Sequence, residues 1–177
     1  MKITIIRHGK VNMQWKKWYT SKQFDLACAN YDISPLYPMH ETENAVSCDI
    51  YISTLKRSKE TAEHLFGKKE FIETKLLNEV PLKSFCDCNI PLPLCFFNII
   101  GRAQWFFQSR RQPERRQDTK KRADELIALL LQKNRDCVLI SHGFFMQTFI
   151  KELKQSEFRI DKKSLAFANL EKITAIK

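Results

Sequence analysis

Short apolar runs typical of β-strands alternate along this chain with longer segments of helical periodicity. Helical segments lie after the second run and on both sides of the fourth. The four runs, each bounded by polar residues or glycine, are 2–6, 48–53, 70–77 and 136–141. Neighbouring parallel strands need a long crossover, which is usually a helix. The alternation therefore predicts a three-layer α/β fold, in which a doubly wound, mostly parallel sheet carries helices on both faces.

The expected helices are defined by apolar residues that recur three or four positions apart. The first begins after Thr54, the second is expected to be capped by Asp118 or Thr119, and the third follows the fourth strand directly. Their apolar faces are Leu55, Ala62, Leu65 and Phe66; Ala123, Leu126, Ile127 and Leu130; and Phe145, Phe149, Ile150 and Leu153. A final apolar segment, 165–177, is predicted to form a terminal pair of strands.

The chain has 177 residues, of which 44% are apolar. A chain of this length can bury about 70% of its unfolded surface in one core, so we expect a single domain over 1–177. The region 81–117 interrupts the alternation, because it concentrates prolines and aromatic residues. We expect it to form a partly helical lid, inserted in the fold and lying over the edge of the sheet. The simplest interpretation of this lid is a hydrophobic cover without chemistry of its own.

Basic residues outnumber acidic ones, 30 to 20, which gives a formal net charge of +10. Such a balance favours anionic partners, among them phosphorylated metabolites, nucleic acids and acidic lipids. The segment 109–122 holds seven basic residues against Glu114 and Asp118, but a charge run before a helix is usually a solvated face. Because no nucleic-acid-binding motif accompanies it, we do not expect nucleic acid to be a main partner.

No apolar run approaches the ~18 residues that a membrane span needs, and the first run is too short for a secretion leader. We therefore expect a soluble, cytoplasmic protein without a membrane partner. The six cysteines are then expected to be reduced thiols, with Cys48 and Cys137 in the core. Cys86, Cys88 and Cys95 fit no zinc-binding spacing, so we expect neither a metal nor another cofactor.

Two strands end in the same unusual way, with a histidine followed by a glycine. The first closes on "IIRHG" and the fourth on "LISHG", although the chain contains only four glycines and four histidines. Ligands of open α/β sheets bind at the carboxyl ends of strands, so we expect His8 and His142 to reach one crevice. Gly9 and Gly143 would let the backbone approach a bound group closely. A single histidine at a strand end is more often a structural residue, but the repetition favours a functional pair.

Two further residues follow strand ends. Arg57 lies in the first turn of the helix after the second strand, where free backbone amides, the helix dipole and a guanidinium together suit phosphate oxygens. Glu79 follows the third apolar run and precedes Pro81. Either residue alone is more often a solvated surface charge. Beside two histidines they become candidates for the walls of the same crevice.

In this order the motifs resemble those of the histidine phosphatase superfamily, which has the phosphoglycerate-mutase-like fold. The matching stretches are "RHGK" at 7–10, "STLKRSKETA" at 53–62, "NEVPL" at 78–82 and "SHG" at 141–143. The resemblance implies that His8 is the nucleophile that takes a phosphoryl group. It also implies that Arg7, Arg57 and His142 bind the phosphoryl oxygens and that Glu79 gives a proton to the leaving group. Fixed cations of this kind stabilise the charge of phosphoryl transfer without a metal.

The substrate-binding residues expected from the motifs are Arg7, Gly9, Lys10, Arg57, His142 and Gly143. Lys10 and the segment 14–24 are expected to flank the entrance of the pocket. There Lys16, Lys17 and Trp18 would meet an anionic, phosphorylated substrate.

One departure from the superfamily pattern bears on the activity. Lys10 and Val11 stand where mutases and sugar bisphosphatases generally carry an acidic residue and then Ser or Thr. This favours a small metal-independent phosphatase that hydrolyses a phosphomonoester or related phospho-compound through a phosphohistidine. Two alternatives stay open: a mutase-type phosphotransferase, and a binding or regulatory member of the same fold that is catalytically weak. Sugar phosphates, phosphohistidine proteins, nucleotides and phosphate intermediates of cofactor synthesis all stay open as substrates.

Overall fold

The computed structural model describes residues 1–40, 42–43, 46–162 and 166–177. Its centre is a six-stranded sheet in the order β4-β3-β6-β1-β8-β7. β1, β3, β4 and β6 are parallel to one another, whereas β8 is antiparallel to both β1 and β7. The bounds of these strands are Lys2–Arg7 (β1), Asp49–Ile52 (β3), Ile72–Glu73 (β4), Cys137–Ser141 (β6), Arg159–Ile160 (β7) and Lys172–Ile176 (β8). The expected mostly parallel sheet is confirmed.

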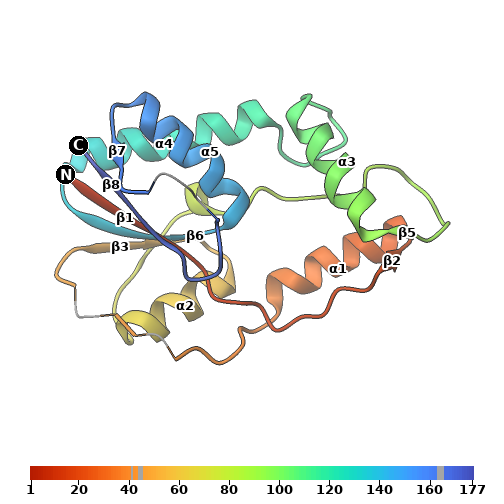
Figure 1. Cartoon of the computed structure of the whole chain (residues 1–177), viewed down its shortest axis with the longest axis horizontal. Coiled ribbons are helices and arrows are strands. Elements are labelled where there is room, and N and C mark those ends of the chain that lie inside the picture. Colours follow the sequence, from red (N-terminus) through yellow and green to blue (C-terminus); the bar gives the residue numbers. More distant parts are fainter. Residues whose placement is uncertain (41, 44–45, 163–165) are drawn as a thin grey trace.

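Helices cover both faces of this sheet (Figure 1). α4 (Arg116–Lys133) and α5 (Gly143–Gln155) lie on one face, and α2 (Lys56–Phe66) lies on the other. Side chains of a strand point alternately to the two faces, so Ile5 shares a core with α4 and α5, whereas its neighbour Ile6 shares a core with α2. The three-layer, doubly wound arrangement follows from this alternation.

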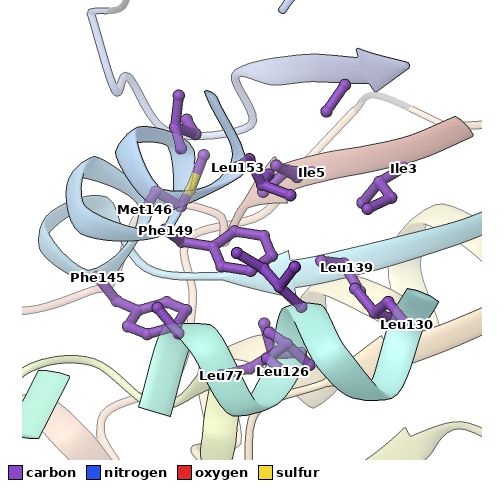
Figure 2. Packing of buried hydrophobic residues seen from close by; sticks show 14 of the residues in the cluster. Ile3, Ile5, Leu77, Leu126, Leu130, Leu139, Phe145, Met146, Phe149 and Leu153 are labelled. Carbon is purple, nitrogen blue, oxygen red and sulfur yellow. The ribbon is translucent and has the colours of Figure 1, made fainter. Parts of the chain in front are cut away.

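Figure 2 shows the larger of the two cores. Ile3, Ile5 and Leu139 of the sheet pack there against apolar residues of both helices. The helical residues are Leu126 and Leu130 of α4 and Phe145, Met146, Phe149 and Leu153 of α5. Each buried side chain of this size contributes roughly 1.5–3 kcal/mol. This packing fixes the start of α5, which directly follows the second His-Gly motif.

A second group of elements lies beyond the carboxyl ends of the parallel strands (Figure 1). It consists of α1 (Ser21–Ile33), α3 (Leu94–Phe106) and a small sheet of β2 (Trp18–Tyr19) and β5 (Leu92–Pro93). The two helices share an apolar cluster of their own, in which the rings of Phe24 and Phe97 stack at 4.6 Å between centroids. The region 81–117 thus contains a helix, and its action as a lid stays a prediction, as does the single domain.

Two expectations about strands are wrong. The run 70–77 forms only the short strand β4, and the 3-10 helix η1 (Lys75–Leu77) follows it. The hydroxyl of Thr74 accepts a hydrogen bond from the Leu76 amide and so favours the turn. The segment 165–177 holds one strand, β8, whose partner β7 lies before it; Leu165 lies outside the described residues.

The expected cap of the second helix is also wrong. α4 begins at Arg116, and its N-cap is Arg115 instead of Asp118 or Thr119. The carboxylate of Asp118 instead accepts hydrogen bonds from the backbone amide of Arg115 at 3.1 Å and from its Nε at 2.9 Å. A carboxylate in the first turn suits the helix dipole, which explains why an acidic residue marks this start. Among the described residues, no helix is long and apolar enough to cross a membrane.

Candidate active site

β1 and β6 end side by side, and this register brings the two predicted histidines together. Arg7 pairs with Ser141 across the strands, so His8 and His142 are the next residues of the two segments. Their ring centroids lie 4.9 Å apart. Both side chains are almost fully buried, with exposed fractions of 1% and 0%. The repeated motif therefore predicts the pairing correctly, but the histidines lie beneath the surface and not on an open crevice.

The imidazole of His8 is held in one tautomer. Its Nδ1 lies 2.7 Å from the carbonyl oxygen of Gly9. Since a carbonyl oxygen only accepts, Nδ1 carries the proton and Nε2 keeps its lone pair. Burial and the positive charge of Arg57 lower the pKa of His8 to about 3. His8 is therefore a neutral imidazole with an unprotonated Nε2 near neutral pH.

The imidazole of His142 is held in the opposite tautomer. Its Nδ1 accepts a hydrogen bond from Arg57 Nε at 3.1 Å, because a guanidinium nitrogen only donates. The proton of His142 is then on Nε2, which donates to Ser53 Oγ at 2.7 Å, and Ser53 Oγ in turn donates to Ser58 Oγ at 2.8 Å. Burial, followed by the nearby His8 and Arg57, lowers the pKa of His142 well below its ordinary value. This chain of contacts fixes the ring and keeps it neutral.

Arg57 lies in the first turn of α2 and is the largest of the fully buried side chains. Besides His142, its guanidinium contacts α1: Nη1 lies 2.7 Å from Asp32 Oδ1, and the ring of Tyr31 stacks at 5.0 Å from its central carbon. A buried guanidinium needs a counter-charge. In this structure the counter-charge is the half-exposed carboxylate of Asp32.

Arg7 extends from the end of β1 toward the start of α5. Its Nη1 donates to the carbonyl oxygen of Phe167, whereas its buried Nε has no hydrogen-bond partner among the described residues. A Cβ at Gly143 would lie 3.0 Å from Arg7 Nε. Any other residue at 143 would bring its Cβ tightly against this guanidinium, which gives the second His-Gly motif a concrete steric reason.

Glu79 caps the N-terminus of α5. One carboxylate oxygen accepts from the amide of Phe145 at 2.9 Å, and the other lies 3.3 Å from the amide of Phe144. The first oxygen also accepts from the amide of Val80 at 3.0 Å. Free amides at a helix start favour a negative charge. These contacts place the carboxylate of Glu79 at the start of α5, next to His142 in the sequence.

A cavity of about 690 Å³ opens beside these residues. Arg57 and Glu79 line it together with Tyr31 and Asp32 of α1 and Arg102 of α3. His8 and His142 are not among the residues that line it, within the described part of the chain. Arg57 connects the two parts of the site, because it lines the cavity and donates a hydrogen bond to His142.

Within the described part of the chain, the candidates Gly9 and Lys10 are not among the residues that line this cavity. The amide of Gly9 donates to Thr61 Oγ1 at 2.9 Å, so it is already used inside the fold. The ammonium group of Lys10 is exposed and lies 5.2 Å from the ring centroid of Tyr37. In the expected entrance segment, the cavity is lined by Trp15 and Phe24 and not by the lysines or Trp18.

Sequence reasoning missed the contribution of α1. Neither Tyr31 nor Asp32 belongs to a motif, and the helix that carries them was not expected. Its start could have been found, because the Thr20 hydroxyl and the Gln23 side chain form a reciprocal capping box. Arg102 of α3 was also missed; it donates to the carbonyl oxygen of Val80 at 3.1 Å. Its sequence context contains no pattern that distinguishes it from a surface arginine.

Among the described residues, no group of three or more His, Cys, Asp or Glu side chains is arranged to hold a metal ion. The six cysteines are free thiols, and Cys137 is buried in the sheet as expected. Among the cations of the site are Arg57 and Arg7, whose charges both act on His8, and Arg102 in the cavity wall.

Several solved structures with the same fold are described as phosphatases. The protein is similar to phosphoserine phosphatase from Entamoeba histolytica, a mutant solved with phosphoserine, at 20% identity and a TM-score of 0.58, over 98% of this chain and 89% of that one. It is also similar to a putative alpha-ribazole-5'-P phosphatase from Escherichia coli, at 17% identity and a TM-score of 0.56, over 86% and 79% of the two chains. A mycobacterial glucosyl-3-phosphoglycerate phosphatase follows at 16% identity and a TM-score of 0.54, over 87% and 79%.

These likenesses establish the fold. No curated protein is similar enough in sequence to be matched to the chain. The family is given by a separate comparison, in which the model of the histidine phosphatase superfamily (branch 1) matches residues 3–163. The match confirms both the resemblance carried by the four motifs and the expectation of an enzyme of the phosphatase class. The chain belongs to the histidine phosphatase superfamily and has its phosphoglycerate-mutase-like α/β fold.

Proposed function

We propose that this protein is a metal-independent phosphatase that hydrolyses a small phosphomonoester in two steps through a phosphohistidine on His8. In the first step, Nε2 of His8 forms a bond to phosphorus while the bond from phosphorus to the leaving oxygen breaks. That oxygen takes a proton from Glu79, whose carboxyl group must enter this step protonated, although the amides at the start of α5 favour its charged form. In the second step, water attacks phosphorus, the phosphorus–nitrogen bond breaks, and the water gives a proton back to Glu79 as phosphate is released.

The observation that carries this proposal is the tautomer of His8. A nucleophilic imidazole must offer a lone pair, and the hydrogen bond from Nδ1 to the Gly9 carbonyl leaves that lone pair on Nε2. The lowered pKa, about 3, keeps the ring unprotonated over the whole physiological range. The same hydrogen bond would stabilise the positive charge that the ring gains when it is phosphorylated.

The cations around His8 suit the charge that develops during phosphoryl transfer. Arg57 and Arg7 carry permanent charges, and both lower the pKa of His8. Fixed charges in a water-poor site stabilise a transition state more strongly than charges in water do. The N–H group at Nε2 of His142 already donates to Ser53 Oγ, so His142 could donate to a phosphoryl oxygen only if that hydrogen bond were broken. Its proposed role is therefore to orient Arg57.

The cavity supports a small phosphorylated metabolite as the substrate. Its walls carry charges of both signs, including Lys75, Lys83 and Arg102 beside Asp25 and Asp32. Such a wall suits a polar, charged leaving group better than an apolar one. The Entamoeba histolytica phosphatase of the same fold has been solved with phosphoserine and with 3-phosphoglyceric acid. We propose action in the cytoplasm, which the free thiols support, and we propose no role for nucleic acid.

The decisive experiment traps the intermediate. Rapid quench with a labelled phosphate ester should give a protein adduct that survives alkali and is lost in acid, as expected for a phosphoramidate. His8→Ala should abolish the adduct, and His64→Ala, which removes a half-buried histidine of α2, should keep it. Label that persists in His8→Ala would show that another residue is the nucleophile. Turnover should survive a chelator and be inhibited competitively by vanadate, a mimic of the in-line transition state.

One observation favours the alternative of a weak or regulatory member. Asp32 contacts Arg57 directly, so in this structure a carboxylate holds the cation that should bind phosphate. A binding protein would form no labelled adduct, yet would still bind a phosphorylated ligand. A mutase-type enzyme would form the adduct but pass the phosphoryl group to a second hydroxyl, with little free phosphate released. Measuring adduct and free phosphate together therefore separates the three possibilities.

A further inference from the structure

An apolar stripe runs along the outer face of α3. Positions 99 and 100 lie three and four residues after 96, and positions 106 and 107 lie seven residues after 99 and 100, so all five fall on one side of the helix and its C-cap. Ile99 and Phe107 are the most exposed of them, with 68% and 77% of their surface accessible to solvent. The exposed large residues of the stripe are Phe96, Ile99, Ile100, Phe106 and Phe107. Soluble monomers rarely leave so many large apolar side chains together on one element.

The opposite face of the same helix fixes the orientation of this stripe. Phe97, Gly101 and Trp105 are buried against the rest of the protein. Trp105 Nε1 donates to Thr119 Oγ1 at 2.9 Å, and a Cβ at Gly101 would collide with Leu82. The stripe therefore cannot turn inward without breaking these contacts, and burial of the stripe must come from outside the fold.

Positive charge lies at the C-terminal end of the stripe. The guanidinium of Arg116 lies 4.5 Å from the ring centroid of Phe106, and Arg110 is exposed next to the end of α3. Four other cations of the run 109–122 are held in ion pairs, namely Arg111 with Asp87, Arg115 with Asp118, Lys120 with Glu152 and Arg122 with Glu114. Within the described residues, Arg110, Arg116 and Lys121 are in no ion pair, so their charge is available to a partner.

The N-terminal end of the stripe carries a cation and an indole. The amide of Leu94, the first residue of α3, donates to the carbonyl oxygen of Lys17 at 2.9 Å. Trp18 is 57% exposed and pairs with Pro93 in the small sheet. Lys17 is exposed as well. Tryptophan and lysine are typical of segments that lie at the boundary between lipid and water.

We propose that the apolar stripe of α3, with the cations at its two ends, docks on an anionic lipid bilayer, in contrast to the expectation from the sequence that the protein has no membrane partner. Exposed Phe and Ile residues would enter the boundary between headgroups and acyl chains, while Lys17, Arg110 and Arg116 contact the phosphates. The chain carries a net charge of +10, so two copies that met through this basic face would repel each other. Duplex nucleic acid presents phosphates outside its stacked bases and therefore offers little apolar surface to the stripe. Charge complementarity therefore selects an acidic lipid surface.

The test measures binding of the full chain to vesicles of two compositions. Vesicles with about a third phosphatidylglycerol should pull the protein down at low salt and release much of it at high salt. Neutral phosphatidylcholine vesicles should bind it weakly. Ile99→Gln/Phe107→Gln removes apolar surface without changing charge and should weaken binding at least about tenfold. Ile33→Gln, at a position 69% exposed on the far end of α1, is the matched control and should bind as the wild type does.

A second pair of variants tests the charges. Arg110→Gln/Arg116→Gln should weaken binding to anionic vesicles by about thirtyfold, whereas Lys68→Gln/Lys69→Gln, with the same loss of net charge beside α2, should change it little. Equal losses in both pairs would mean that overall charge and not this face binds the vesicles, and would overturn the proposal. The proposal would also be overturned if Ile99→Gln/Phe107→Gln bound the anionic vesicles as tightly as the wild type does. A concentration-dependent dimer that those changes dissociate, without vesicle binding, would assign the stripe to a second copy instead.

Discussion

The carboxylate of Asp32 lies 2.7 Å from the guanidinium of Arg57, which also donates to His142. Asp32 reaches this position from α1, a helix outside every catalytic motif. A phosphate that binds Arg57 must share this guanidinium with Asp32 or displace it. The pair is half-exposed on the Asp32 side, so its contribution is limited to about 1 kcal/mol.

Asp32→Asn is therefore expected to tighten the binding of phosphate and vanadate by about three- to fivefold, because Arg57 loses a competing anion. Inhibition constants measured at steady state provide the test. Asp25→Asn is the matched control, since Asp25 lines the same cavity but accepts hydrogen bonds from Ser84 and not from Arg57. Weaker phosphate binding in Asp32→Asn would mean that Asp32 positions Arg57 for the substrate.

Acid should destabilise the fold through its buried histidines. The pKa of His8 is about 3 in the folded protein, against an ordinary value of 6.5. Between these two pH values the unfolded chain binds more protons, so the free energy of unfolding falls as the pH drops below about 7. Each buried neutral histidine should remove about 1.4 kcal/mol between pH 7.5 and 5.5.

Urea denaturation at the two pH values measures this effect. His8→Gln should show a smaller fall in the free energy of unfolding than the wild type, and His142→Gln should behave similarly, because the pKa of His142 is also lowered by burial. The comparison concerns the difference between the two pH values and not the absolute stability of each variant. An unchanged difference in both variants would show that the acid sensitivity has another source.

Ser53 is expected to be the more important of the two hydroxyls that hold His142. Its Oγ is 2.7 Å from His142 Nε2, whereas Ser58 Oγ is 3.3 Å away. Ser53→Ala leaves a buried N–H with only the longer contact and should cost about 1–3 kcal/mol of stability. Ser58→Ala should cost less. Denaturation curves of the two variants show which substitution lowers the free energy of unfolding more. The kcat of Ser53→Ala should also fall if His142 orients Arg57.

The pairing of His8 with His142 could be predicted from the sequence because strand ends carry positional information. A strand of a parallel sheet delivers its next residue to a known edge, and two identical endings on neighbouring strands place their histidines together. Arg57 could be predicted for the same reason, since it lies in the first turn of α2, the helix that follows β3. The superfamily motifs add the expected roles of these residues.

Asp32 and Arg102 could not be predicted in the same way. Each lies in the middle or at the end of a helix, and its position in the site depends on how α1 and α3 pack through Phe24 and Phe97. That packing is a long-range contact with no local pattern. The apolar stripe of α3 was equally hidden, because an apolar periodicity does not say which face of a helix is covered.

The proposed role of Glu79 as the general acid can be tested with substrates that differ in their leaving group. A general acid matters most when the leaving oxygen is a poor leaving group. Glu79→Gln should therefore slow phosphorylation of His8 by an alkyl phosphate by ~10²–10⁴-fold. With p-nitrophenyl phosphate the loss should be far smaller, since nitrophenolate leaves readily without a proton. Single-turnover rates are required, because water attack in the second step could hide the difference at steady state.

The structure adds a control to this comparison, because Glu79 also caps α5. Its carboxylate accepts from the amides of Phe144 and Phe145, so replacing it removes charge from a helix start and should cost about 0.5–2 kcal/mol of stability. Ser141→Ala, which removes the hydrogen bond from the Ser141 hydroxyl to Leu77 O, perturbs the same region without touching the proposed acid. It should slow both substrates by the same factor. If Glu79→Gln also slows both equally while staying folded, Glu79 is a helix cap that shapes the pocket, and the proton comes from another group.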